Sequence, residues 1–341
     1  MSATSSTTKS TDIPGIALDL GTRFIRIGFY DRQSDRAQIV MLEDGFRECP
    51  VFYGVSAGET LVGLSAYQNA LRQPKSSVCD LLSFFDPTTA DANKHNGNTQ
   101  IELSDPRGPD GGKQHKVKAS DCLKSVISAL KNNVIDALSS QTDLSSTQLQ
   151  KTLLPCVLCV SAAIASSSSA KETLIELINT CGFKVMDVLP SSVAVALATG
   201  IDRPLPTANG RIELVAVCEL GVHTKVSVIE RHTATGLFTL LGSQQNAERG
   251  GDQLDKKIVA HFCETFKRAE REDCSSNVRS MAKLSRSAEQ VRRTLSQSSQ
   301  APVHIDSLFE GIDFSTNLNR GRVEMLCSNE IAQLLEPVQA L

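Results

Sequence analysis

Two stretches of the chain, far apart in the sequence, share one pattern of apolar and polar positions. In each, an apolar strand ends in an acid-Leu-Gly turn, and a second strand then alternates apolar and polar residues. The first reads GIALDLGTRFIRIGFYDR over 15–32, and the second reads IELVAVCELGVHTKVSVIE over 212–230. Both are predicted to be tight hairpins with one carboxylate at the tip, Asp19 and Glu219. Two matched hairpins indicate two related lobes.

Helical and strand patterns alternate between the hairpins, which indicates an α/β architecture. Residues 119–138 predict an amphipathic helix, and its apolar positions are Cys122, Val126, Ala129, Val134 and Leu138. Ser169 and Glu172 form a capping-box pattern at the start of a further helix. Residues 86–113, rich in Asp, Asn, Gly and Pro, predict a long exposed loop or a reduced subdomain.

Two long helices are predicted after the second hairpin. The apolar stripe of the first helix consists of Leu254, Ile258, Phe262 and Phe266. The stripe of the second consists of Val278, Met281, Leu284, Ala288, Val291 and Leu295. Ser275, Ser276 or Asn277 is expected to cap the second helix.

Composition narrows the classes of function. A chain of 341 residues with 40% hydrophobic content can bury a large core, and its size favours two lobes. A net charge of -3 leaves no basic field for nucleic acid or anionic lipid. No apolar run approaches a membrane span, and residues 1–12 predict a disordered Ser/Thr-rich tail. We therefore expect no nucleic-acid or membrane partner.

The ten cysteines are expected to be reduced and mostly buried, which places the chain in the cytoplasm, with the nucleus as an alternative. Cys156 and Cys159 form the CxxC of the chain. They lie in an apolar run that predicts a buried strand, where residues three apart point to opposite faces. Neither a zinc site nor a redox site is expected there.

The hairpin tips suggest chemistry with phosphate. Glycine lets backbone N–H groups approach a phosphate, and a carboxylate can hold hydrated Mg²⁺. Two lobes that each carry such a tip can close around a phosphorylated ligand. This is a nucleotide hypothesis drawn from the residues alone.

Several longer stretches resemble the DnaK-type chaperones of the 70-kilodalton heat-shock family. The most specific are RRTLSQSSQAPVHIDSLFEGIDF at 292–314 and RGGDQLDKKIVAHFCETFKR at 249–268. DLGT at 19–22, the GxRxxP pattern at 45–50 and LVGLSAYQNALRQP at 61–74 agree as well. The resemblance implies the two-lobed ATPase fold shared with actin and the sugar kinases, built on ribonuclease H-like repeats.

The resemblance also implies sites for ATP or ADP. The adenosine positions of the family fall on Glu289, Arg292, Arg293 and Ser296. The phosphate-loop positions fall on Asp19, Gly21, Thr22, Glu219, Gly221, Thr224, Gly250 and Gly251. Asp19 and Glu219 would hold Mg²⁺ weakly, through water. Without the resemblance, the helix charges would be interpreted as an ordinary ion pair on a solvated face.

Other positions depart from the family pattern. Leu82 stands where the resemblance implies a catalytic lysine, and Ser191 stands where it implies a glutamate near Mg²⁺. In the second loop, Val222 and His223 replace glycines, which crowds the backbone amides. Arg23, His223 and Lys225 either neutralise phosphate in place of Mg²⁺ or line a relaxed cleft. We expect no catalytic residues and little or no hydrolysis.

The expected organisation is lobe I at 13–205 and lobe II at 206–341, with lobe II incomplete and no peptide-binding domain. The expected function is a chaperone or co-chaperone component that binds adenine nucleotide and acts in protein folding through partner contacts. Its partners would be J-domain co-chaperones or ribosome-associated proteins, and unfolded clients only if a longer chain exists. A nucleotide-independent scaffold and an active folding ATPase are the alternatives.

Overall fold

The chain divides into two compact units, which are described separately. The computed structural model describes residues 13–31, 34–42, 45–88, 97–108, 114–204, 210–246, 249–334 and 336–339. Unit 1 comprises 1–69 and 75–199, and unit 2 comprises 70–74 and 200–341. The predicted tail at 1–12 lies outside the described residues. The mixed helices and strands confirm the predicted α/β class.

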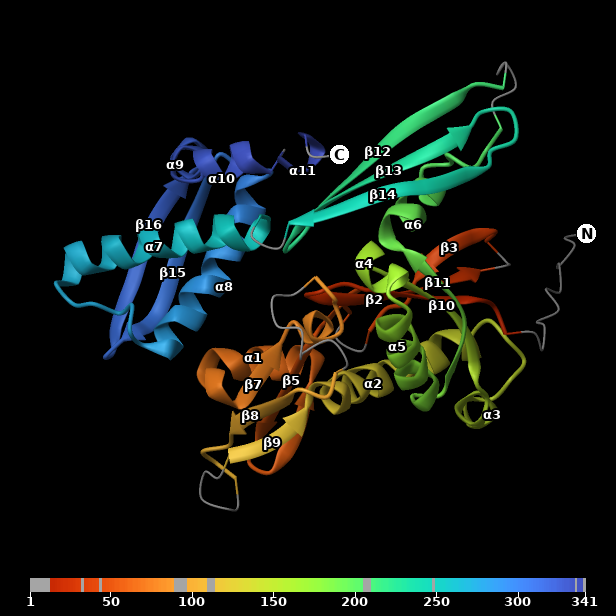
Figure 1. The fold of residues 1–341 in the computed structure, drawn as a ribbon. Helices are drawn as coiled ribbons and strands as arrows, with labels where there is room; N and C mark the ends of the chain where they lie inside the picture. Colours follow the sequence, from red (N-terminus) through yellow and green to blue (C-terminus); the bar gives the residue numbers. More distant parts are fainter. Residues whose placement is uncertain are drawn as a thin grey trace, which may run out of the picture. The chain divides into compact units, whose positions relative to one another are not determined.

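The first predicted hairpin is confirmed, and it forms the centre of the main sheet of unit 1 (Figure 1). The sheet order is β11-β10-β1-β2-β3, with β4 paired to β2. Strands β1, β10 and β11 are parallel, whereas β2 is antiparallel to β1, β3 and β4. The strands are β1 (Ile16–Leu20), β2 (Phe24–Asp31), β3 (Arg36–Ile39), β4 (Cys49–Pro50), β10 (Leu154–Val160) and β11 (Phe183–Pro190).

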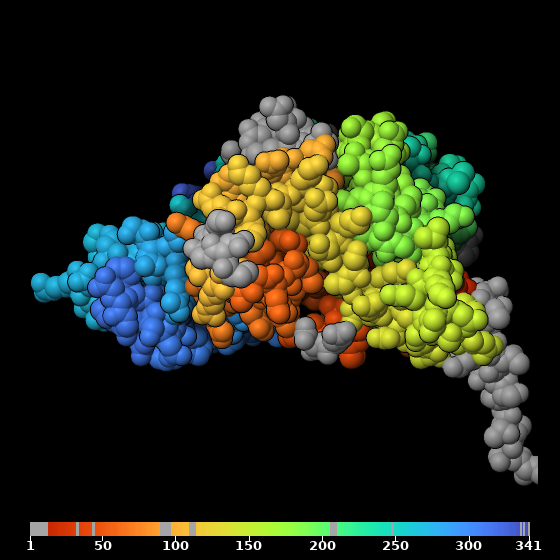
Figure 2. Space-filling model, turned by 90° about the horizontal axis from the view of Figure 1, so that it is seen from below, coloured from red at the N-terminus to blue at the C-terminus, as the bar shows by residue number. Residues whose placement is uncertain are grey.

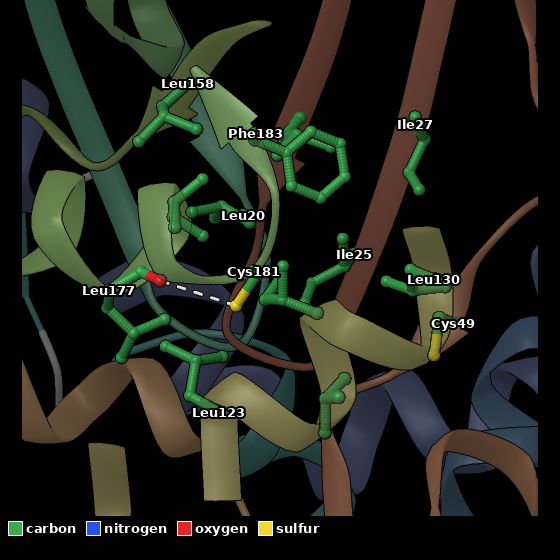
Figure 3. Packing of buried hydrophobic residues seen from close by; sticks show 14 of the residues in the cluster. Leu20, Ile25, Ile27, Cys49, Leu123, Leu130, Leu158, Leu177, Cys181 and Phe183 are labelled. Atoms are coloured by element: carbon green, nitrogen blue, oxygen red, sulfur yellow. Dashed lines mark hydrogen bonds between the residues drawn. The ribbon is translucent and has the colours of Figure 1, made fainter. Parts of the chain in front are cut away.

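Helices bury this sheet because each presents an apolar face to it. Leu123 and Leu130 from α2, Leu177 from α5 and Cys181 just after α5 share one core with strand residues such as Phe183 (Figure 3). In Figure 2, the yellow to light-green residues of these helices leave only small areas of the red first strands visible. The helices are α2 (Ala119–Ser139), α3 (Ser146–Lys151), α4 (Ala162–Ser166), α5 (Ser168–Thr180) and α6 (Ser191–Ala198).

Smaller elements complete unit 1, and a short β-hairpin begins within the predicted loop at 86–113 and ends just after it. The hairpin strands are β8 (Gln100–Ser104) and β9 (Gln114–Lys118). The prediction missed it because these strands carry few apolar residues, Ile101, Leu103 and Val117. The remaining elements are β5 (Phe52–Ser56), β6 (Glu59–Val62), α1 (Gly63–Arg72), η1 (Pro74–Ser76), β7 (Ser77–Cys79) and η2 (Leu81–Phe84). The end of α1 and the first residue of η1 belong to unit 2.

Unit 2 contains the second predicted hairpin, which is also confirmed. Strands β12 (Ile212–Leu220), β13 (Thr224–His232) and β14 (Phe238–Asn246) form an antiparallel sheet in that order. Among the described residues, β12 is an edge strand, and one of its faces is an exposed apolar row. The row consists of Ile212, Leu214, Ala216, Cys218 and Leu220. Ile212, Leu214 and Leu220 are 62%, 67% and 66% exposed.

The two predicted long helices are confirmed as α7 (Gly251–Glu270) and α8 (Val278–Leu295). They pack on the hairpin of β15 (Gln300–Phe309) and β16 (Ile312–Asn319), and the shared core includes Phe262, Phe266 and Phe314 (Figure 1). Asn277 caps α8, because its side chain accepts a hydrogen bond from the Ser280 amide. Three short helices follow: α9 (Arg320–Leu326), α10 (Ser328–Gln333) and α11 (Glu336–Gln339).

Three details of the predicted helices are wrong. Ala129 and Val278 were assigned to buried stripes, but both are exposed. The cap of α5 is Ser167, whose side chain accepts from the Ala170 amide, rather than the predicted box of Ser169 and Glu172. Consecutive serines offer equivalent caps locally, and the end of α4 at Ser166 selects Ser167.

Candidate nucleotide-binding site

Asp19 lies at the edge where three parallel strands of unit 1 end. It pairs in register with Cys159 of β10, and Cys159 pairs with Leu189 of β11. Ligands of open α/β sheets bind at this carboxyl edge of the strands. In the adjoining turn, the Gly21 amide donates to the Phe24 carbonyl over 3.1 Å. The first predicted loop is therefore placed where a ligand site is expected.

A guanidinium group accompanies the Asp19 carboxylate. Asp19 is directly opposite Arg26 in the β1–β2 register. Arg26 Nη1 lies 3.4 Å from Asp19 Oδ2, and Arg26 Nη2 lies 2.7 Å from Glu48 Oε2. Arg26 and Glu48 were not singled out in the sequence. For Arg26, the available signal was its place in the predicted hairpin, where it can lie opposite Asp19. Glu48 lies outside that hairpin, and its contact depends on packing.

Arg23, one of the three cations considered as a substitute for Mg²⁺, is in an ion pair within unit 1. Arg23 Nε lies 3.0 Å from Asp80 Oδ1, and about a third of each side chain is exposed. Asp80 has a positive φ of 56° at the start of η2. The structure thus directs this charge toward Asp80.

Leu82 and Ser191 stand where the family resemblance implied a lysine and a glutamate. Leu82 is 4% exposed and belongs to the core of unit 1. Ser191 begins α6, and its buried hydroxyl has no hydrogen-bond partner among the described residues. Neither side chain supplies the charge that a lysine or a glutamate would bring.

The second loop differs from the first in its register. In the first hairpin the pairing closes at Leu20 and Ile25, which leaves residues 21–24 in the turn. In the second it closes at Leu220 and Thr224, which leaves 221–223. Glu219 is directly opposite Lys225, so in both hairpins a base faces the acid across the strands.

The second loop is joined to the start of α7. The Gly251 amide donates to the Gly221 carbonyl over 2.8 Å, and the Thr224 amide donates to the Arg249 carbonyl over 2.6 Å. Gly250 has φ 152°, and a Cβ atom there would lie 2.1 Å from the Val222 carbonyl oxygen. A residue larger than glycine would push the loop away from the helix.

Arg292 reaches from α8 to this junction. Its Nε and Nη2 donate to the two carboxylate oxygens of Asp255 on α7, over 2.6 and 3.0 Å. A Cβ atom on Gly251 would lie 3.3 Å from Arg292 Nη2. Burial raises the pKa of Asp255, against the influence of Arg292, and the hydrogen bond to Asp255 raises the pKa of Arg292.

The other predicted adenosine residues interact along α8. Arg293 Nη2 lies 2.8 Å from Glu289 Oε1, one helical turn away. The Ser296 hydroxyl donates to the Arg293 carbonyl over 2.6 Å. The i,i+4 pair is the ordinary ion pair that the sequence left open as an alternative. The Arg293 side chain is 56% exposed, whereas that of Glu289 is 21% exposed.

Unit 2 therefore brings Gly221, Gly250, Gly251 and Arg292 together. Thr224 is buried there, and its hydroxyl has no partner among the described residues. Asp19, Gly21 and Thr22 lie in unit 1. Asp255 was missed in the sequence, because its contact with Arg292 depends on how α7 and α8 are rotated against each other.

Two searches of the described residues bear on other kinds of site. No group of three or more His, Cys, Asp or Glu side chains there is arranged to hold a metal ion. In the same part of the chain, every helix is too short or too polar to cross a bilayer.

Comparisons with known proteins identify similar chains. A family model described as Hsp70 protein matches residues 15–341. Heat shock 70 kDa protein 2 of Paracoccidioides lutzii is 29% identical over 333 residues, which cover 96% of this chain and 48% of the relative. Putative heat shock 70 kDa protein 7 of Homo sapiens is 29% identical over 331 residues, covering 95% and 85%. Heat shock 70 kDa protein 14 of Xenopus tropicalis is 27% identical over 337 residues, covering 96% and 62%. The chain spans about half the length of the first of these relatives.

Proposed function

Because the chain belongs to the Hsp70 protein family, we propose that it binds ATP or ADP, hydrolyses ATP little or not at all, and acts in protein folding through contacts with other proteins. The family supports a chaperone-type ATPase domain. The narrower claim is that the chain binds ATP without hydrolysing it. It rests on a contrast between Arg292 and Gly251, which support binding, and Leu82 and Ser191, which lack the charges that hydrolysis needs.

One observation carries the binding half of the proposal: the Arg292 guanidinium lies against Gly251, beside the second loop. Asp255 fixes the guanidinium through two hydrogen bonds, so its plane is oriented before a ligand arrives. A fixed, planar cation next to a glycine-lined turn suits stacking on a purine. Glu289 on the same helix and Ser296 just after its end offer polar groups for the ribose.

The residues at 82 and 191 support the absence of hydrolysis. Phosphoryl transfer depends on positioned charges, and a core leucine with a neutral serine provides none. The loss of one stabilising donor typically slows an enzyme by roughly a hundred- to a thousandfold. With both groups replaced, bound ATP is expected to persist.

Calorimetry with ADP and ATP tests the binding half. Wild-type protein is expected to give saturable heat, and Arg292→Lys is expected to weaken the affinity roughly tenfold, or about 1.4 kcal/mol, because lysine loses the oriented plane. Arg268→Lys, at an exposed position of α7, is the matched control and should leave the affinity unchanged. Absence of saturable heat at millimolar ligand would favour the nucleotide-independent scaffold.

A single-turnover assay with labelled ATP tests the hydrolytic half. Purified protein is expected to release no more phosphate than a protein-free control, with or without a J-domain protein. Steady release that a J-domain protein stimulates would instead favour an active folding ATPase.

We further propose J-domain co-chaperones or ribosome-associated proteins as partners and the cytoplasm as the location. Sedimentation with ribosomes is the direct check of the ribosome-associated partners.

A further inference from the structure

We propose that Arg26 takes the place of a divalent cation beside Asp19, so that nucleotide binding by this chain does not depend on Mg²⁺. The inference rests on the proposed nucleotide binding and names its ion requirement. It uses unit 1 alone, where the acid, the guanidinium and a second carboxylate form one group.

The backbone holds Arg26 in position from two sides. The β1–β2 register places Asp19 directly opposite Arg26. Strand β4 pairs with β2 through Cys49 and Ile25, and this pairing holds the neighbouring Glu48 beside Arg26. The two nitrogen–oxygen distances, 3.4 Å to Asp19 and 2.7 Å to Glu48, join the guanidinium to both acids. The side chain is thus oriented by the fold and not only by its own rotamer preference.

The residues at this edge do not fit a hydrated Mg²⁺ ion. Such an ion is usually held by one or two carboxylates together with the phosphates of the ligand. A permanent cation already lies beside Asp19 and is shared with Glu48, since arginine does not lose its proton in proteins. A second cation at the same carboxylate would meet like-charge repulsion. Ser191, at the start of α6, adds a neutral hydroxyl where the resemblance implied a glutamate.

A guanidinium can perform the electrostatic part of the ion's work. It offsets part of the negative charge of Asp19 and Glu48, which would otherwise repel a phosphate approaching the Gly21 turn. Its N–H groups form strong, directed hydrogen bonds with carboxylate or phosphate oxygens. The second hairpin repeats the arrangement in sequence register, because Lys225 is directly opposite Glu219. A base opposite the acid at both hairpin tips supports the same role for the two basic side chains.

The test measures ADP affinity of the full chain by calorimetry, in excess Mg²⁺ and in EDTA. For wild type, the two affinities are expected to agree within about threefold, well below the 5- to 150-fold range typical of coupled ligands. For Arg26→Ser, removal of the fixed cation should expose Asp19, and Mg²⁺ should then strengthen ADP binding about tenfold. Arg36→Ser, on the neighbouring strand β3, is the matched control and should behave as wild type.

Metal binding without nucleotide gives a second readout. Mn²⁺ serves as the probe, followed by its paramagnetic resonance signal. Wild type is expected to bind no Mn²⁺ that depends on Asp19, whereas Arg26→Ser should bind one ion that Asp19→Asn removes. Circular dichroism shows whether each variant is folded, and Arg26→Gln, which also removes the positive charge, replaces Arg26→Ser if the serine variant is not.

The outcomes separate this inference from the proposed function. If wild type binds ADP at least about tenfold more tightly with Mg²⁺, the inference is wrong and nucleotide binding stands. If ADP binds under neither condition, the proposed function fails, and the Mn²⁺ measurement decides the role of Arg26. Asp19-dependent Mn²⁺ binding by wild type overturns it in either case.

Discussion

Asp105 shows how one buried carboxylate can hold a turn and a loop of unit 1. Its oxygens accept from the amides of Ala57, Gly58 and Arg107 over 3.0, 2.8 and 3.2 Å. Ala57 has a positive φ of 54°, so the turn contains a residue in a conformation that needs support. The Gly58 amide is the leading cause that lowers the pKa of Asp105.

The lowered pKa predicts how acid affects stability. Because the folded state favours the charged form of Asp105, its contribution to stability is complete above the ordinary Asp pKa of about 3.9. It is lost as the pH falls below that value and through the lowered pKa of the folded state. Asp105→Asn should therefore be less stable than wild type at pH 7, with a difference that shrinks toward pH 3. Urea unfolding across this range measures it. Glu102→Gln, at an exposed pair with Lys116, is the control and should change little.

Gly250 predicts a steric effect at a single position. Gly250→Ala places a methyl group 2.1 Å from the Val222 carbonyl oxygen, so the loop or the start of α7 must move. Gly311→Ala is the matched control, since its φ is also positive, at 85°, but nothing lies within 4 Å of its added Cβ. The first variant should melt at a lower temperature than the second. Equal melting temperatures would mean that backbone strain alone matters at Gly250.

At the scale of elements, the core of α7, α8 and the β15–β16 hairpin depends on aromatic contacts. Phe262 is fully buried, and its ring meets Phe314 edge to face at a centroid distance of 5.6 Å. Phe262→Ala should lower the free energy of unfolding of this unit by about 3–5 kcal/mol, through lost burial and a cavity. Urea denaturation measures the change. Phe262→Leu should cost less, and a smaller loss for alanine than for leucine would contradict this account.

The periodicity of α7 and α8 was enough to predict both helices, because a stripe at Ile258, Phe262 and Phe266 repeats each turn. The position of Arg292 on α8 followed from the family resemblance. Its partner Asp255 did not, since the pairing requires two helices to meet at one rotation and height. The same reason explains why Glu48 was missed beside Arg26. Local patterns specify elements, whereas these contacts depend on their packing.

At the scale of the molecule, all ten cysteines are free thiols, and only Cys218 is exposed. Burial raises the pKa of Cys122 and Cys156 to about 12, and does the same for Cys263. Thiolates are the reactive species, so these residues should resist modification in the native protein. A thiol reagent such as DTNB should modify one residue rapidly in buffer and all ten in denaturant. The rapid phase should vanish in Cys218→Ser, and its survival there would refute the assignment.

The matched hairpins at 15–32 and 212–230 predicted a repeated architecture without any knowledge of the sheets. They could not predict that the second turn has three residues and the first has four. The second turn also bonds to the start of α7 through the Gly221 carbonyl, a contact that the local pattern does not contain. They also could not give the order β11-β10-β1, since parallel neighbours are brought together from distant segments. Pattern identified which segments are strands, and long-range pairing determined their neighbours.

The row of side chains on β12, led by Leu214, has a consequence for how the protein behaves in salt. Sulfate is excluded from protein surfaces and makes exposed apolar area less favourable in water. Ammonium sulfate should therefore precipitate the wild-type chain at a lower concentration than Leu214→Lys. Glu213→Lys, on the opposite face of the strand, adds a positive charge without removing apolar area and should move the precipitation point less. One strand face would thus lower the salt concentration at which this protein precipitates.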